Sequence, residues 1–221
     1  MSPNVVITGA NRGIGLALCK RYLQLGYNVY AACRKAGPEL KNLNAVVIEQ
    51  VDVGTAQGVE TLKTALHNVP VDVLINNAGI FSNQTLGSFD YGAAQHMFAV
   101  NALGPLRVTE ALYGHMGAGS KVVLITSRMG SIADNGSGGY YGYRMSKAAL
   151  NAAGKTLALE LAESGISVAI IHPGFVQTEM VGGMGDISAD TAAERISDRI
   201  KDLDLQNTGI FWHSNGEELP W

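Results

Sequence analysis

The sequence carries little charge and little cysteine, and these shortages exclude several classes of protein. Charged residues make up 16% of the chain, its net charge is −3 and no block of like charges occurs, so the basic face required for nucleic-acid binding is missing. No apolar run reaches the roughly 20 residues of a membrane-spanning helix. The first residues do not show the basic start and apolar stretch of a secretory signal, so we expect none. We therefore expect a cytoplasmic protein with no membrane partner.

Cysteine is limited to Cys19 and Cys33, which both stand among apolar residues. Their spacing does not suit a metal site, and we expect two buried thiols in a reducing compartment, with a disulfide as the less favoured alternative. No cluster of histidine, cysteine or carboxylate residues has metal-ligand spacing, so the sequence predicts no metal.

Short β-branched runs alternate with longer segments in which apolar residues recur at three- and four-residue steps, as on a helix face. The expected strands are residues 4–8, 28–33, 45–51, 71–76, 121–126 and 167–173, with a last one near 209–213. The expected helices are residues 13–26, 58–69, 93–116, 145–165 and 188–203. Strands without polar alternation are covered on both faces. The sequence therefore predicts an α/β fold, a Rossmann-type doubly wound parallel sheet of about seven strands with helices on both faces, in a single domain spanning residues 1–221.

The first expected strand runs directly into TGANRGIG, residues 8–15, which opens a helix. Gly9 permits a tight turn, Gly13 lets the backbone approach a pyrophosphate, and Gly15 lets helix and strand pack closely. The helix N-terminus adds free N–H groups and the positive end of its dipole. Three glycines alone are a weak signal, but at a strand-to-helix junction they predict a dinucleotide site, with the spacing GxxxGxG in place of the usual GxGxxG.

Further motifs follow in order: VDV at 51–53, NNAG at 76–79, SRMG at 127–130, YRMSK at 143–147 and PGFVQT at 173–178. With the glycine loop, they resemble the short-chain dehydrogenase/reductase family over the whole chain. The stretch 127–151 and the ending FWHSNGEELPW look most like its C-factor and sniffer-type carbonyl reductase subgroup. In that family NNAG steadies the central sheet beside the adenine ribose and Asp52 meets the adenine amino group. The resemblance implies the cofactor-binding residues Gly9, Asn11, Arg12, Gly13, Ile14, Gly15, Arg34, Asp52, Val53, Asn77, Ala78, Gly79, Tyr143, Lys147, Pro173, Gly174, Val176 and Thr178.

Three tyrosines stand close together in GYYGYRMSKAAL, and only one has a cation at helical spacing. Tyr143 and Lys147 are four residues apart, so they are neighbours on one helix face. Tyr141 points to another face, and Tyr140 lies two turns back; the surrounding glycines place both before the helix and make them lining or packing residues. The resemblance makes Tyr143 the proton donor and Lys147 the group that lowers its pKa and bonds the nicotinamide ribose.

A serine hydroxyl completes the catalytic set that the resemblance implies, by stabilising the developing oxyanion. Ser127 directly follows a strand but lies sixteen residues before Tyr143, where the family spacing is close to thirteen. Ser131, twelve before Tyr143, is the alternative, or a loop-capping hydroxyl. Asn101 matches the family asparagine whose backbone holds a proton-relay water, although a mid-helix asparagine also bends helices by side-chain competition.

The end of the second strand favours NADP(H) over NAD. Ala32 and Cys33 stand where NAD-selective chains place a carboxylate for the ribose hydroxyl, and Arg34 follows at once. Arg12 in the loop is a second guanidinium, and two of them suit the 2′-phosphate of NADP. The alternative is that both are solvated surface charges.

The resemblance leads us to expect reduction of a ketone or aldehyde with NADPH. A short lid near 176–191, rich in glycine and methionine, indicates an open, apolar pocket for a small-molecule carbonyl substrate. Family members are joined as homodimers or homotetramers through the long helices, here around 90–117 and 143–164. Two alternatives are an epimerase or dehydratase, which resembles longer chains, and a dinucleotide-binding signalling or redox-sensing protein of the C-factor type.

Overall fold

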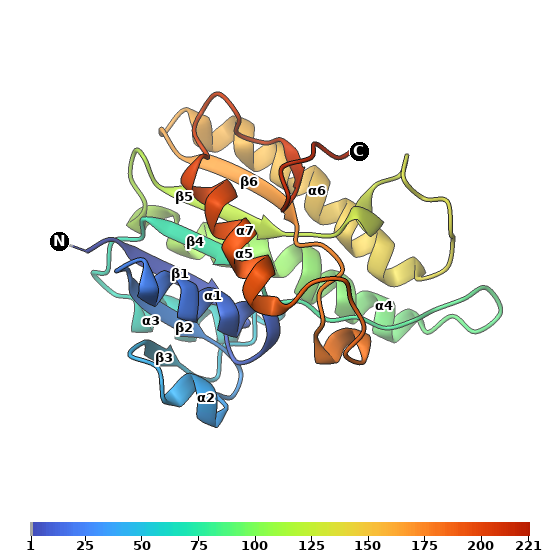
Figure 1. The fold of residues 1–221 in the computed structure, drawn as a ribbon, viewed down its shortest axis with the longest axis horizontal. Helices are drawn as coiled ribbons and strands as arrows, with labels where there is room; N and C mark the ends of the chain where they lie inside the picture. Colours follow the sequence, from blue (N-terminus) through green and yellow to red (C-terminus); the bar gives the residue numbers. More distant parts are fainter. Residues whose placement is uncertain (1) are drawn as a thin grey trace.

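Seven parallel strands form one sheet at the centre of the molecule (Figure 1). The computed structural model describes residues 2–221. In sheet order the strands are β3 (Val46–Ile48), β2 (Asn28–Ala32), β1 (Asn4–Thr8), β4 (Val73–Asn76), β5 (Lys121–Ile125), β6 (Ser167–His172) and β7 (Phe211–His213). The strand order reverses between β1 and β4. In doubly wound sheets, ligands bind at this reversal, outside the carboxyl ends of the strands.

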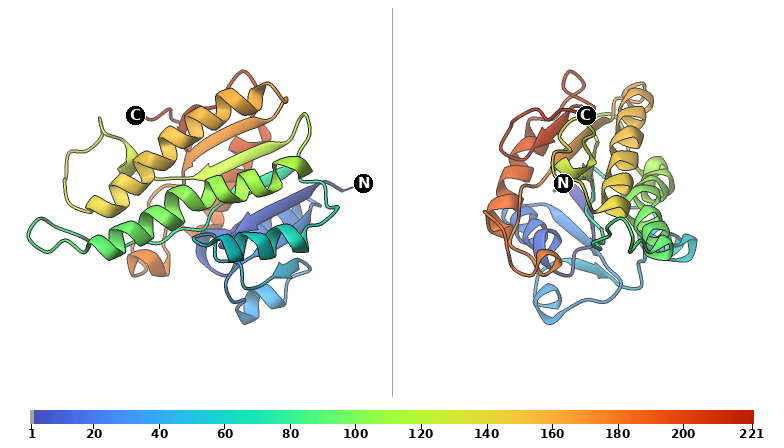
Figure 2. Two further views of the ribbon diagram at one scale, coloured as in Figure 1. Left: turned by 180° about the vertical axis from the view of Figure 1, so that it is seen from behind. Right: turned by 90° about the vertical axis from the view of Figure 1, so that its right-hand side faces the viewer.

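Helices connect the strands and cover both faces of the sheet. They are α1 (Gly13–Gln24), α2 (Pro38–Lys41), α3 (Ala56–Ala65), α4 (Tyr91–Phe98), α5 (Gly104–Leu112), α6 (Tyr141–Ala162) and α7 (Ala189–Lys201). A π-helix, η1 (Ala99–Leu103), and the 3-10 turns η2 (Tyr113–His115), η3 (Arg128–Gly130) and η4 (Glu179–Val181) complete the set. Helices α1 and α7 lie on one face, and α3, α5 and α6 lie on the other (Figure 2). The predicted fold class is confirmed.

The central strands are buried on both sides, which explains their continuous apolar sequence. Successive strand residues point to opposite faces, so β1 contributes to two cores. Val5 and Ile7 pack with α1 and α7, whereas Val6 packs with α3 and α5. Every residue of β1, β4 and β6 is buried. Within residues 2–221, no helix combines the length and the apolarity of a membrane span.

The secondary structure departs from the prediction in three places. The helix expected at 93–116 is interrupted by η1, because Pro105 has no N–H to donate to the carbonyl four residues earlier and the hydrogen-bond ladder shifts there. The strand expected at 45–51 is only β3, since Gln50, with φ of 62°, interrupts the extended backbone after Ile48. Helix α2 was not predicted, because four residues are too few to display a helical period.

Candidate active site

A cleft of about 1050 Å³ opens along the carboxyl ends of the strands, where the topology reverses. It gathers segments that are far apart in the sequence: the glycine loop, the ends of β2 to β6, the first turn of α6 and the segment between β6 and α7. The predicted residues on its wall are Gly9, Asn11, Arg12, Gly13, Ile14, Gly15, Arg34, Asp52, Val53, Asn77, Ala78, Gly79, Ser127, Tyr143, Lys147, Pro173, Gly174, Val176 and Thr178. Of the predicted site residues, Asn101 alone is not part of this wall.

The glycine loop between β1 and α1 has a geometry that only glycine permits. Gly9 and Gly13 have φ of 66° and 53°, in the left-handed region. A Cβ on Gly15 would lie 2.2 Å from the Gly9 carbonyl oxygen, so a side chain there would push α1 away from the loop. Helix α1 has no side-chain N-cap and no acidic residue in its first turn. Its first N–H groups and its positive dipole end therefore remain available to an anion in the cleft.

Two polar residues tie the ends of β1 and β4 together beneath the cleft. The Asn77 and Ala78 main-chain N–H groups both donate to Thr8 Oγ1 at 3.1 Å. The Asn77 side chain donates to the Thr8 and Gly9 carbonyl oxygens at 3.0 and 3.2 Å. These bonds fix the glycine loop against the central sheet, the function that the family resemblance assigns to the NNAG motif.

Asp52 stands on the cleft wall just after β3, half-buried. Its Oδ1 atom accepts a hydrogen bond from the Gly54 N–H at 2.9 Å, which orients the carboxylate. The other carboxylate oxygen forms no hydrogen bond within residues 2–221.

Ser127, Tyr143 and Lys147 line the same part of the cleft. Ser127 follows β5 and is the N-cap of η3, where its Oγ accepts from the Met129 N–H at 3.1 Å. Tyr143 lies in the first turn of α6, held by an edge-to-face contact with Phe81 at 5.0 Å between ring centroids. Lys147 lies one turn further on; its Nζ donates to the Ile125 carbonyl oxygen at 2.8 Å and lies 5.8 Å from the Tyr143 ring centroid.

Burial controls the ionisation of the tyrosine and the lysine. It raises the pKa of Tyr143 to about 12, and a hydrogen bond from Ser127 opposes that rise. It lowers the pKa of Lys147 to about 8. In this structure the hydrogen bond from Ser127 lowers the pKa of Tyr143, and the lysine ammonium donates to the Ile125 carbonyl oxygen; the effect of Lys147 on the tyrosine pKa stays a prediction.

The alternative serine occupies a different environment. Ser131 is buried outside the cleft; its Oγ donates to the Trp221 carbonyl oxygen at 3.0 Å and accepts from the Asp134 N–H at 3.0 Å. Ser131 therefore ties the segment after η3 to the end of the chain, and Ser127 is the serine that the fold brings to Tyr143.

Asn101 lies fully buried in η1, behind the cleft wall. Its Oδ1 accepts from the Ile80 N–H at 2.8 Å, and its Nδ2 donates to the Ile80 carbonyl oxygen at 2.9 Å and to Ser146 Oγ at 3.0 Å. The side chain thus locks the segment after β4 to α6. A Cβ on Gly79 would lie 3.4 Å from Asn101 Oδ1 and 3.8 Å from Lys147 Nζ, so both side chains reach the backbone of Gly79.

The two predicted phosphate-binding arginines are in different situations. Arg34 is exposed on the cleft wall and has no carboxylate partner among residues 2–221. Arg12 instead forms an ion pair with Glu179 of η4 across the mouth of the cleft. The expected convergence of two free guanidiniums is therefore not present, because η4 supplies a carboxylate to one of them.

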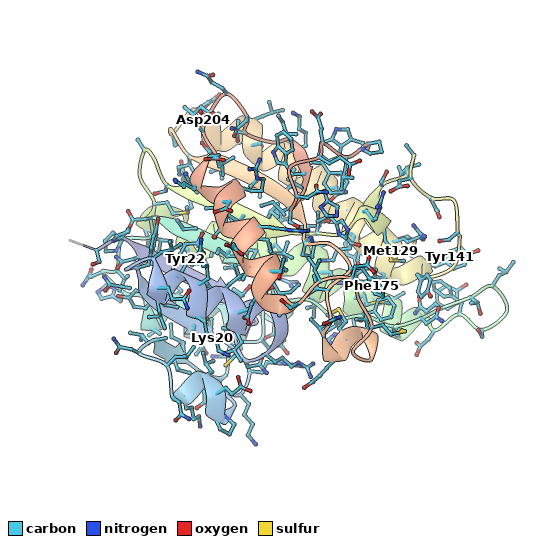
Figure 3. The ribbon with its side chains drawn as sticks, viewed as in Figure 1. Lys20, Tyr22, Met129, Tyr141, Phe175 and Asp204 are labelled. Carbon is cyan, nitrogen blue, oxygen red and sulfur yellow. The ribbon has the colours of Figure 1, made fainter. Side chains whose placement is uncertain are left out.

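The far end of the cleft contains residues that the sequence did not predict. They include apolar side chains in the segments after β4 and β6 and in η3. Two of them, Met129 and Phe175, are labelled in Figure 3. The unpredicted residues also include Arg128 and Arg144, each directly after a predicted catalytic residue, together with the imidazoles His172 and His213. Adjacency to Ser127 and Tyr143 is the signal that indicates the arginines. No comparable signal points to His213, which arrives on β7.

Of the remaining tyrosines, Tyr140 lines the cleft and precedes α6 with a left-handed backbone, as predicted. Tyr141 is instead the first residue of α6 and is exposed beside Phe89. Cys19 and Cys33 are buried free thiols, and burial raises the pKa of Cys19 to about 12.

Comparison with known proteins adds independent evidence. The family model described as short chain dehydrogenase matches residues 3–187. The 1-hydroxy-2-glutathionyl-2-methyl-3-butene dehydrogenase of Rhodococcus sp. strain AD45 is 36% identical over 223 residues, covering 98% of this chain and 99% of the relative. The C-signal protein of Myxococcus xanthus is 44% identical over 155 residues, 69% of this chain and 93% of its own.

Among solved structures, the NADPH-bound carbonyl reductase from chicken fatty liver superimposes with a TM-score of 0.91 at 26% identity, covering 100% of this chain and 99% of that one. The family match spans most of the chain and includes the glycine loop, Ser127, Tyr143 and Lys147. The resemblance found in the sequence is confirmed, and the chain belongs to the short-chain dehydrogenase family.

Proposed function

We propose that this oxidoreductase is an NADPH-dependent carbonyl reductase, which converts a ketone or aldehyde to an alcohol with Tyr143 as proton donor. One observation carries the proposal: a single cleft holds a glycine loop suited to a dinucleotide and, beside it, the hydroxyls of Ser127 and Tyr143 with the ammonium of Lys147. The likeness to the NADPH-bound chicken carbonyl reductase extends over the whole chain and supports the same reading.

The residues at the β1–β2 end fit a dinucleotide. The uncapped first turn of α1 offers N–H groups to the pyrophosphate, and Gly13 leaves room for its approach. The second carboxylate oxygen of Asp52 would accept a hydrogen bond from the adenine amino group. Pro173, Gly174, Val176 and Thr178 would border the nicotinamide end, where Lys147 would bond the ribose.

Arg34 supports a preference for NADPH. It stands directly after β2, where Ala32 and Cys33 supply no carboxylate to favour NAD, and nothing acidic neutralises it within the described chain. A guanidinium there would form charge-assisted bonds with the 2′-phosphate. Because Arg12 is paired with Glu179, we assign the main phosphate contact to Arg34.

The protein's part in the reaction is proton transfer and oxyanion stabilisation. When bound, NADPH supplies a hydride to the carbonyl carbon. Ser127 donates a hydrogen bond to the oxygen on which charge develops, and Tyr143 gives that oxygen its proton. With a pKa of about 12, Tyr143 holds its proton throughout the neutral range. Lys147, one turn along α6, offsets the negative charge that the donated proton leaves behind.

A signalling or redox-sensing function without catalysis is the alternative that the C-signal likeness invites. The placement of Tyr143, Ser127 and Lys147 on one cleft wall favours catalysis, because a protein that only binds a dinucleotide has no use for this proton-donating set.

The segment 176–191 serves as the substrate lid in this proposal. It starts with a bridge between Val176 and Ile187, continues through η4 and ends at the first turn of α7. Met180 and Met184 line the cleft and are exposed, giving the lid an adaptable apolar surface.

We further propose that two or four copies associate through the face that carries α4, α5 and α6. Large apolar side chains are exposed on these helices: Tyr91, Phe98, Met145 and Leu159. Light scattering on the purified protein tests this, and a monomer at micromolar concentration contradicts it.

The decisive experiment measures NADPH consumption with a panel of aldehydes and ketones, in wild type and in the Tyr143→Phe variant. We expect turnover of at least one carbonyl by the wild type, its loss in the variant, and unchanged NADPH binding by fluorescence titration. A wild type that binds NADPH but reduces no carbonyl in the panel contradicts the proposal and favours the signalling alternative.

A further inference from the structure

Arg144 carries a positive charge that no residue of the described chain neutralises. It follows Tyr143 in the first turn of α6, is half-buried and lines the cleft. Its guanidinium donates only to neutral acceptors: Ser137 Oγ at 2.8 Å, and the carbonyl oxygens of Met129 and Gly138, both at 3.4 Å. It forms no ion pair within residues 2–221, and its Nε is buried without a hydrogen-bond partner.

A second guanidinium lies at the same end of the cleft. Arg128 directly follows Ser127 and lines the cleft, and its Nε donates to Asp134 Oδ2 at 2.8 Å. The Asp134 carboxylate occupies one edge of Arg128 and leaves its terminal NH₂ groups free of any such partner. The reacting hydroxyls of Ser127 and Tyr143 are thus each followed in the sequence by a cation on the same wall.

Two imidazoles complete this end without adding charge. His172 and His213 stack edge to face with ring centroids 4.9 Å apart, and both line the cleft. Burial lowers the pKa of His172 to about 3, and it also lowers that of His213, so both rings are neutral at physiological pH. His172 Nδ1 is buried and has no hydrogen-bond partner among residues 2–221.

The acids that line the cleft do not offset these cations. Glu179 is paired with Arg12, and Asp52 lies at the adenine end. Asp186, on the lid, is exposed and forms no ion pair with Arg128 or Arg144. An unneutralised guanidinium at a partly buried site costs desolvation free energy, which an anionic ligand recovers through charge-assisted hydrogen bonds.

We propose that the substrates of this enzyme are carbonyl compounds that carry a carboxylate, which Arg144, assisted by Arg128, binds while Ser127 and Tyr143 hold the carbonyl oxygen. The two bonds of Arg144 to carbonyl oxygens are long, at 3.4 Å, so a substrate carboxylate can replace them with charge-assisted hydrogen bonds that orient the substrate as well as attracting it. This assignment of the substrate class rests on the carbonyl reductase function proposed above. The proposal changes the expectation of an apolar pocket, because the wall that holds the methionines and phenylalanines also holds two guanidiniums.

A purely structural role for Arg144 makes a different prediction. Its bonds to Ser137 and Gly138 also pin the segment before α6, and their loss would disturb every substrate alike. Recognition of a carboxylate disturbs only substrates that possess one. The ratio of kcat/KM for an acid to that for its neutral ester therefore separates the two roles.

The test uses the ortho, meta and para carboxybenzaldehydes and their methyl esters, with saturating NADPH. We expect wild type to prefer at least one acid over its ester, and Arg144→Gln to lower that ratio about tenfold or more, mainly through KM of the acid. Arg144→Lys should keep part of the preference, because it retains the charge without the planar guanidinium. Lys63→Gln, which removes an exposed cation of α3 outside the cleft, should leave the ratio unchanged.

Three results overturn the inference. The first is a wild type that prefers every ester, and the second is an Arg144→Gln variant that slows acid and ester equally, which indicates loop pinning. Reduction of neither acids nor esters is the third, and it removes the proposed function as well. Turnover of the esters alone by the wild type retains carbonyl reduction and rejects only the anionic substrate class.

Discussion

The two ends of the cleft differ in whether backbone groups or side chains form the binding surface. At the β1–β2 end the part of the wall suited to a pyrophosphate is main chain: Gly9 and Gly13 in left-handed conformations, and the uncapped N–H groups that begin α1. At the other end the wall is side chain: Arg128, Arg144 and Phe175 reach in from three separate segments. A site made of backbone requires glycine at fixed positions, whereas a site made of side chains tolerates many residue types. The first is therefore visible in a sequence, and the second emerges only from the fold.

The largest effect should come from the residue that lies between these two ends. Tyr143→Phe removes the proton donor while keeping the ring that packs on Phe81, so kcat should fall by about 10²–10⁴-fold with NADPH affinity intact. Tyr140→Phe, on the cleft wall, and Tyr141→Phe, outside it, are matched controls and should cost far less. Steady-state kinetics on the three variants decide the assignment, and a Tyr143→Phe enzyme with near wild-type kcat rejects it.

The two serines differ in their surroundings, because Ser127 lines the cleft and Ser131 lies outside it. Ser127→Ala removes a hydroxyl that interacts with Tyr143 and should lower kcat by about 10²–10³-fold, as for loss of an oxyanion donor. Ser131→Ala breaks bonds to Trp221 and Asp134 and should lower the melting temperature while leaving kcat close to that of the wild type. Paired kinetics and thermal unfolding test this, and the opposite ranking in kcat transfers the role to Ser131.

A smaller effect should distinguish the two cofactors at the backbone-built end. Arg34→Ala should raise KM for NADPH by roughly 10- to 100-fold, the range for loss of a hydrogen bond to a charged group, with little change for NADH. Arg12→Ala should have the weaker effect on NADPH because Glu179 already engages that guanidinium. The measurement is kcat/KM for both cofactors in each variant, and a wild type that prefers NADH contradicts the assignment.

The smallest effect concerns pH. Lys147 has a pKa of about 8, so its ammonium is present below pH 8 and is lost above it, whereas Tyr143, at about 12, stays protonated. Carbonyl reduction should be level below about pH 7 and should fall up to tenfold per pH unit above 8. A pH profile of kcat/KM checks this, and a Lys147→Met variant should lack the inflection at its lower residual rate.

Stability should change with pH in the opposite direction from activity. An unfolded lysine keeps its proton up to its ordinary pKa of about 10.5, so above pH 8 the unfolded state binds more protons than the folded state. The unfolding free energy contributed by Lys147 therefore rises between pH 8 and 10.5. The difference in melting temperature between Lys147→Met and wild type isolates this contribution. At neutral pH the variant should melt at a higher temperature than the wild type, and this difference should shrink as the pH rises.

Much of the fold was predictable because apolar strands buried on both faces have a continuous pattern, as β4 and β6 do. Gly9, Gly15 and the Tyr143–Lys147 spacing were predictable because each meets a geometric requirement that few residues satisfy. The choice of Ser127 over Ser131 depended on the strand end, which fixes a side chain better than a count of residues does.

The parts that could not be predicted depend on contacts between distant segments. The pairing of Arg12 with Glu179 joins residues 167 positions apart, and neither has a local signature of it. His213 reaches the cleft only because β7 pairs with β6. The pKa of Tyr143 is governed by how deeply the fold buries it, which the spacing to Lys147 does not reveal.

The π-helix η1 determines the rotational phase between two helices. Helix α4 packs against α6, whereas α5 packs against α3, so the chain must turn its apolar stripe between them. Each residue of an α-helix advances the side chains by about 100° around the axis. Removing a single residue from η1 would therefore swing Val108 and Leu112 away from the core that they share with α3. The π-helix η1, which contains Asn101, thus also sets the rotation of α5 relative to the sheet.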